Sequence, residues 1–145
     1  MKINCLVIDD EPLAIQVIKT HLDQIPGIEI ISTFQNPVEA LDMIKSIKID
    51  LIFLDIEMPL LSGIELLKTL QHPPKVIFTT AYRNYAIESY ELDVVDYLLK
   101  PISFTRFLKA INKYKNLVNI KVTESKVKEA ESNDHLYVNS NKKFI

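Results

Sequence analysis

The stretch IFLDIEMP, residues 52–59, carries an apolar run directly into an acidic side chain. The run begins at Leu51 and does not alternate with polar residues, which is typical of a strand covered on both faces in a parallel sheet. It stops at Asp55, and a second acid, Glu57, follows two residues later. The stretch therefore predicts a central strand of a parallel sheet with a carboxylate at its end.

Four further apolar runs, rich in β-branched and aromatic residues, recur along the chain at similar intervals. The five runs are INCLVI (3–8), IEII (28–31), LIFL (51–54), VIFT (76–79) and VVDYLL (94–99). Most of them lack the strict alternation of a half-exposed strand, so we expect a sheet that is buried on both faces.

Segments with a helical period follow the runs. The first helix is expected after Pro12, the second after the cap Asn36, and the third after a capping box that begins at Ser62. An apolar stripe over residues 104–118, with Ser103 as its cap, predicts the last helix. The alternation βαβαβαβαβα predicts an α/β fold, a doubly wound three-layer sandwich with right-handed crossovers.

Composition limits the class of protein. The chain has 145 residues, 48% hydrophobic and 25% charged, which suits one compact domain with a short appendage. Its net charge of -2 provides no positive field for nucleic acid, so DNA binding by this part of the chain is not expected. The single cysteine, Cys5, lies in an apolar run and is expected in the core of a protein from a reducing compartment. No run approaches the ~18 apolar residues of a membrane span, so a cytoplasmic protein without membrane contact is expected.

Polar residues end four of the five predicted strands, at one edge of the sheet. They are Asp9-Asp10, Asp55, Thr79-Thr80 and Lys100-Pro101. Each of them alone is more often a cap or turn former than a functional group. Three carboxylates on neighbouring strands repel one another unless they are protonated or bridged by a cation, and hard oxygen ligands suit Mg²⁺. With a hydroxyl and an ammonium beside them, they predict a clamp for three phosphoryl oxygens.

Five segments together resemble the receiver domain of two-component response regulators. They are IDDEP (8–12), LDIEMP (54–59), SG (62–63), TTAY (79–82) and DYLLKP (96–101). The resemblance covers residues 1–120. It implies a flavodoxin-like (βα)5 fold with a parallel five-stranded sheet of order 2-1-3-4-5.

The resemblance also implies roles for the acids. Asp55 matches the aspartate that accepts a phosphoryl group from a sensor histidine kinase. Asp10 matches the direct Mg²⁺ ligand, and Asp9 matches its partner, which acts largely through water. Glu57 matches the position that gives its backbone carbonyl to the metal, with a side chain that at most tunes the lifetime of the phosphoryl group.

The residues on the last two strands have roles by the same resemblance. Thr80 matches the switch hydroxyl that moves toward the phosphoryl group, and Lys100 matches the lysine that pairs with that group. Tyr97 matches the aromatic residue whose rotamer reports the change; an ordinary half-buried strand aromatic is the alternative. Pro101 matches a proline with a preceding cis peptide bond, which would aim Lys100 inward.

The composition changes after residue 120. Residues 121–133 are polar and mixed in charge, which indicates a helix extension fraying into a linker. Together, TTAYRNYA (79–86), DVVDYLLKPI (93–102) and DHLYVNSNKKFI (134–145) resemble the LytTR class of response regulators, so residues 134–145 are expected to begin a truncated DNA-binding output domain. A free-standing receiver with a ragged tail is the alternative.

The expected function is a phosphorylation-controlled switch in a transcription regulator, not an enzyme. The expected partners are a sensor histidine kinase, a second copy of the chain bound through the fourth helix, fifth strand and fifth helix, and promoter DNA through the missing C-terminal domain. A Mg²⁺-dependent aspartate-nucleophile phosphatase is disfavoured. Such enzymes carry two aspartates in a DxD arrangement at the end of the first strand, where this chain has the adjacent pair Asp9-Asp10. An interaction module that works without phosphorylation is disfavoured too, because every position of the phosphoryl site is filled.

Overall fold

The computed structural model describes residues 2–83 and 92–131, with side chains as far as Asn119 in the last helix. Its elements are β1 (Ile3–Ile8), α1 (Pro12–Leu22), β2 (Ile28–Phe34), α2 (Pro37–Ser46), β3 (Leu51–Asp55), α3 (Gly63–Thr69), β4 (Lys75–Thr80), β5 (Asp96–Leu99) and α5 (Phe104–Glu131). The described residues divide into two units, one up to Ala110 and the other from Ile111 onward.

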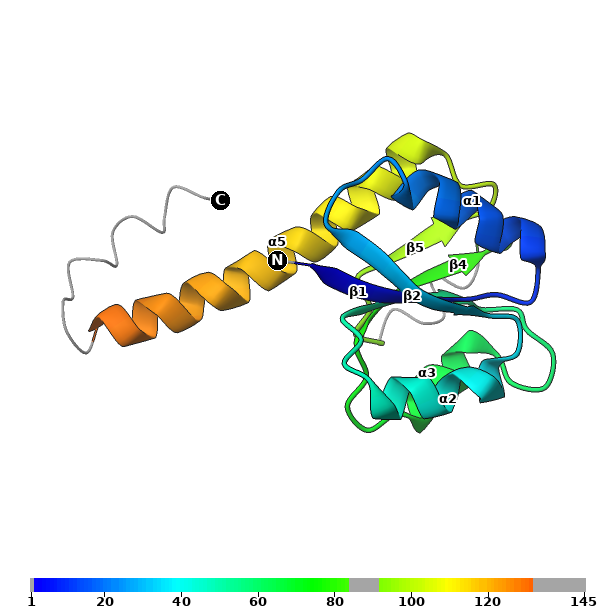
Figure 1. Cartoon of the computed structure of the whole chain (residues 1–145), viewed down its shortest axis with the longest axis horizontal. Coiled ribbons are helices and arrows are strands. Elements are labelled where there is room, and N and C mark those ends of the chain that lie inside the picture. The colour runs from blue at the N-terminus through cyan, green and yellow to red at the C-terminus, as the bar shows by residue number, and fades with distance from the viewer. Residues whose placement is uncertain (1, 84–91, 132–145) are drawn as a thin grey trace. The chain divides into compact units, whose positions relative to one another are not determined.

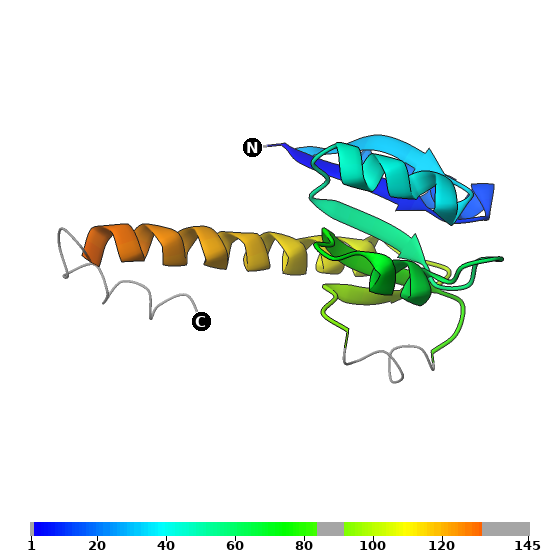
Figure 2. The same ribbon diagram turned by 90° about the horizontal axis from the view of Figure 1, so that it is seen from below.

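The first unit is built on a parallel five-stranded sheet of order β2-β1-β3-β4-β5. Helix α1 lies on one face of this sheet and α2 and α3 lie on the other, as Figure 1 shows, and Figure 2 looks onto the face covered by α2 and α3. The start of α5 joins the α1 face, because Phe107 stacks on Phe53 of β3 with ring centroids 5.2 Å apart. The predicted doubly wound sandwich and its strand order are confirmed.

The central strands are buried on both faces. All five residues of β3 are buried. On the face toward α2 and α3, Ile52 and Leu54 join a core cluster with Leu6, Ile8 and Phe78 from the neighbouring strands. On the other face Phe53 meets Phe107. Continuous apolar runs therefore mark the central strands because neither face of the sheet is available to polar residues there.

Local capping fixes where α2 and α3 begin. The side chain of Asn36 accepts a hydrogen bond from the Val38 N–H at 2.9 Å. Ser62 and Glu65 form the predicted capping box, with the serine hydroxyl accepting from the Glu65 N–H at 3.1 Å and the glutamate accepting from the Ser62 N–H at 2.9 Å. Such caps satisfy backbone donors that have no partner within the helix.

The strand boundaries differ from the sequence prediction at two places. β2 continues to Phe34 rather than residue 31, because after a register shift between Cys5 and Leu6 the tail of β2 pairs with the end of β1. β5 begins at Asp96 rather than residue 94, because the Val94 N–H bonds back to the Leu92 carbonyl and leaves the ladder. The predicted fourth helix falls largely on residues 84–91 and lies outside the described residues.

The last helix is longer than its apolar stripe. α5 runs to Glu131, so the segment expected to fray into a linker is helical over residues 121–131. Within the described ranges, no helix is both long and apolar enough to cross a membrane. Cys5 lies in the core as predicted, and burial raises the pKa of its thiol to about 12, which keeps it neutral.

Candidate functional site

The strand register brings the predicted site residues to one edge. Ile8 of β1 pairs with Leu54 of β3, so Asp9 and Asp55, the next residue on each strand, end side by side. Asp55 in turn pairs with Thr79 of β4. In β5 Leu99 pairs with Thr80, which places Lys100 directly beyond the end of β4. All four strands thus deliver polar groups to their carboxyl ends, where open α/β sheets bind ligands.

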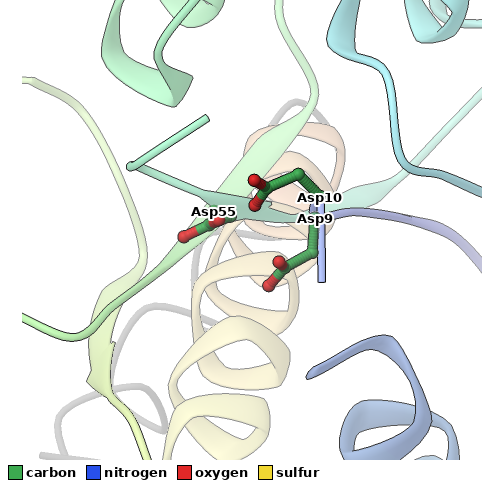
Figure 3. Close-up of side chains that lie close together, drawn as sticks. All are labelled: Asp9, Asp10 and Asp55. Atoms are coloured by element: carbon green, nitrogen blue, oxygen red, sulfur yellow. The ribbon is translucent and has the colours of Figure 1, made fainter. Parts of the chain in front are cut away.

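Asp9, Asp10 and Asp55 converge as predicted. Each offers one carboxylate oxygen, and these oxygens lie within 4.8 Å of one another (Figure 3). Asp9 and Asp55 are buried. The Glu11 N–H donates to Oδ1 of Asp9 at 2.9 Å, which orients that carboxylate.

The cluster fits a Mg²⁺ ion. Oδ2 of Asp9 and Oδ1 of Asp55 are buried, and among the described residues the cation beside them is the ammonium of Lys100, 3.0 and 3.4 Å away. One ammonium does not balance three converging carboxylates, and buried negative charge is costly unless a further cation neutralises it. A small set of such oxygens, open on one side, is what Mg²⁺ uses in phosphoryl sites.

Lys100 supplies the positive charge at the site. Its Nζ lies 3.0 Å from Oδ2 of Asp9, 3.4 Å from Oδ1 of Asp55 and 3.1 Å from Oε1 of Glu11. Burial opposes the charge on Lys100, but the close carboxylate of Asp9 and then that of Asp55 outweigh it and raise the pKa of the ammonium. The Lys100–Pro101 peptide bond is cis, as the family resemblance implied.

The surroundings of Asp55 disfavour its ionised form. Burial, then the charge of Asp9, raise the pKa of this carboxyl from 3.8 to about 8, although Lys100 opposes the shift. An acid whose pKa is higher in the folded than in the unfolded chain contributes stability at low pH, and that contribution is lost as the pH rises through the folded value. The folded protein without metal should therefore become less stable between about pH 4 and pH 8.

Replacing Asp55 by asparagine should remove this pH dependence. We expect the free energy of unfolding of Asp55→Asn, minus that of the native protein, to increase by up to about 4 kcal/mol from pH 5 to pH 8 without metal. Chemical unfolding at several pH values measures the difference, in which titrating groups remote from Asp55 cancel. A difference that is constant with pH would show that Asp55 ionises normally.

The hydroxyl of Thr80 is engaged by a residue from the neighbouring loop. It donates to Oε2 of Glu57 at 2.6 Å, and the Ala81 N–H donates to Oε1 of the same carboxylate at 3.1 Å. The sequence suggested only a backbone role and a minor tuning role for Glu57. The structure adds two hydrogen bonds made by its side chain.

Tyr97 lies on β5, beside β4. The half-buried ring of Tyr97 packs against Phe78 of β4 with centroids 5.5 Å apart. Beside it, Arg106 of α5 binds both oxygens of the buried Asp96 at 2.8 Å and the Tyr97 carbonyl at 3.0 Å. These contacts anchor β5 to the start of α5.

The sequence prediction does not include Glu11 or the pair of Asp96 and Arg106. Glu11 lies within IDDEP, and an acid next to two aspartates is a candidate partner for a lysine at the same edge. Asp96 lies within a predicted buried strand, and a buried carboxylate needs a cation. Arg106, on the following helix, was the available candidate.

Comparison with known proteins agrees with this architecture. Residues 5–112 match the response regulator receiver domain family. The chain belongs to this family of two-component receiver domains. Among solved structures, it resembles the response regulatory domain of mrkE from Klebsiella pneumoniae, with a TM-score of 0.72, 30% identity and coverage of 79% of this chain and 97% of that one. It also resembles the REC domain of AraT, a response regulator from Geobacillus stearothermophilus, with a TM-score of 0.73, 27% identity and coverage of 83% and 99%.

The curated relatives are longer proteins. The sensory transduction protein LytR of Staphylococcus haemolyticus is 39% identical over 117 residues, which are 79% of this chain and 46% of that protein. The transcriptional regulatory protein BtsR of Escherichia coli is 40% identical over 111 residues, with coverage of 75% and 46%. The chain thus spans about half the length of these relatives.

Proposed function

We propose that the chain accepts a phosphoryl group on Asp55 from a sensor histidine kinase, with Mg²⁺ held by Asp9, Asp10, Asp55 and the backbone carbonyl of Glu57. The observation that carries the proposal is the convergence of three carboxylates within 4.8 Å beside the ammonium of Lys100. Acids and a cation in this arrangement suit phosphoryl transfer, in which catalysis is mainly positioning and charge neutralisation.

The proposed step needs little covalent help from the protein. A carboxylate oxygen of Asp55 attacks phosphorus, the bond from phosphorus to the kinase histidine nitrogen breaks, and the imidazole leaves with the electron pair. Bound Mg²⁺ would neutralise charge on the oxygens that it ligates. Lys100, 3.4 Å from Asp55, would pair with a phosphoryl oxygen, and the hydroxyl of Thr80 would donate to another.

The phosphoryl group would act as a switch. It adds charge and acceptors at the buried end of β3, which draws the hydroxyl of Thr80 inward. Tyr97 packs on Phe78 in the neighbouring strand, so movement at the end of β4 would reach its ring. We infer that the result is pairing of two chains through the fourth helix, β5 and α5.

The regulatory output of the protein is proposed from the two curated relatives and from the C-terminal segment of the chain. One relative's name describes sensory transduction and the other's transcriptional regulation, and both extend well beyond the matched region. We propose a receiver over residues 1–120, a linker over 121–133 and the start of a LytTR-type DNA-binding domain over 134–145, in a cytoplasmic regulator that binds promoter DNA through that domain. A stand-alone receiver that acts by protein–protein contact is the alternative.

The proposal is tested by incubating the protein with acetyl phosphate and Mg²⁺ and weighing the intact chain. One phosphoryl adduct is expected, and chelation of the metal by EDTA should slow its formation by roughly 100-fold, the scale seen when one electrostatic group is lost. No adduct with Mg²⁺, or equal rates with EDTA, would refute the proposal. Repeated turnover of a generic phosphate monoester would favour the phosphatase instead.

A further inference from the structure

The carboxylate of Glu57 binds two donors at the end of β4. The Thr80 hydroxyl donates to one oxygen at 2.6 Å, and the Ala81 N–H donates to the other at 3.1 Å. Hydrogen bonds to an ionised acceptor are about twice as strong as neutral ones, and 2.6 Å is typical of a hydroxyl bound to a carboxylate. Two donors that converge on one anion form a small anion site, which the protein fills with its own side chain.

This contact fixes the direction of the Thr80 hydroxyl. Its oxygen accepts the Tyr82 N–H at 3.0 Å, while its single proton lies toward Glu57. The Tyr82 carbonyl, at 3.3 Å, is a more distant acceptor for the same proton. Since Thr80 is buried, no bulk water competes for that proton. The hydroxyl cannot donate to an oxygen on Asp55 while Glu57 holds it.

We infer that Glu57 is a latch for the unphosphorylated state: its carboxylate retains the switch hydroxyl of Thr80 and the Ala81 N–H, and phosphorylation must displace it. The inference rests on the proposed function, because it assumes that Thr80 turns toward a phosphoryl group on Asp55. It differs from the backbone role proposed for the same residue, since only side-chain atoms take part.

Charge explains why the latch would release. A phosphoryl group on Asp55 carries more negative charge and more acceptor oxygens than a carboxylate. It would compete for the Thr80 hydroxyl and repel the carboxylate of Glu57, which comes from the loop directly after Asp55. Without the phosphoryl group the latch favours the resting state, so it lowers the apparent affinity for any anion that needs Thr80.

The contact itself is tested without any phosphoryl donor. In an amide NMR spectrum of the metal-free protein, Glu57→Ala should move the Ala81 signal upfield, because its N–H loses a charged acceptor. Glu57→Gln keeps one acceptor oxygen but not the charge, so its Ala81 signal should lie between those of the native protein and of Glu57→Ala. An Ala81 signal that is the same in all three proteins would overturn the inference, even if Asp55 is phosphorylated normally.

The energetic role is tested with beryllofluoride and Mg²⁺ in a double-mutant cycle. Glu57→Ala should tighten beryllofluoride binding by about tenfold, the scale of one hydrogen bond to a charged group. In a Thr80→Val background, which lacks the hydroxyl, the same substitution should tighten it by only about twofold, through loss of charge. An equal gain in both backgrounds, or no gain in either, would overturn the latch. If no protein binds beryllofluoride, the proposed function fails, and the NMR comparison still decides whether Glu57 holds these donors.

Discussion

Replacement of Lys100 by methionine is expected to lower the free energy of unfolding by about 3 kcal/mol at pH 8 without metal. The ammonium lies 3.0 Å from Asp9 and 3.4 Å from Asp55, and both acids are buried. Removing one partner of a buried pair costs roughly 3–5 kcal/mol because the remaining charge has no compensation. We expect the lower end of that range, since Asp55 can take up a proton instead.

Mg²⁺ should restore much of this loss, because the ion would replace the missing positive charge beside the same oxygens. The matched control is Lys2→Met. In the native protein, Nζ of Lys2 lies 2.7 Å from Oε1 of Glu29, which is closer than any ion-pair contact of Lys100. The side chains of Lys2 and Glu29 are both exposed. Such a pair contributes less than about 1 kcal/mol. Chemical unfolding with and without Mg²⁺ measures both variants, and equal losses would contradict a buried charge cluster.

Replacement of Arg106 by methionine should cost about 2–3 kcal/mol of unfolding free energy, whether or not Mg²⁺ is present, because the buried Asp96 loses two bonds from a partly exposed arginine. The guanidinium binds both oxygens of Asp96 and the Tyr97 carbonyl, and Asp96 is only 8% exposed. The carboxylate would keep the Tyr97 N–H at 2.8 Å but lose both bonds from the arginine.

Arg106→Lys is the control for charge alone. Lysine keeps the positive charge but cannot form the two parallel bonds, so a partial loss is expected. The independence from Mg²⁺ separates this pair from the Lys100 site in the same unfolding assay. A loss below about 0.5 kcal/mol for Arg106→Met would mean that the pair contributes no more than an ordinary surface contact.

The sheet could be predicted from the sequence because burial on both faces leaves a strong pattern. LIFL and INCLVI contain no polar residue that would let either strand face water, except Asn4 near the start of β1. The site residues could be predicted from their places at the ends of the strands, since the residues that follow parallel strands meet at one edge of the sheet. Asp9, Asp10 and Asp55 needed no side-chain geometry to be grouped.

The contacts of Glu57 and Arg106 could not be predicted in this way. Glu57 lies in a loop, where no periodicity sets the direction of a side chain, so its bonds to Thr80 and Ala81 depend on the path of the loop. Gly63 illustrates that path: a Cβ there would overlap the carbonyl oxygen of Asp55. The pairing of Arg106 with Asp96 depends on how α5 packs beside β5, which local sequence does not specify.

The most direct test of the account is to locate the phosphoryl adduct formed from acetyl phosphate and Mg²⁺. Intact-mass measurement should find one adduct on the native chain and on Asp23→Asn, which removes an exposed aspartate at the C-terminal cap of α1. Asp55→Asn should carry none. An adduct of the same stoichiometry on Asp55→Asn would contradict the account, because it would place the acceptor at another residue.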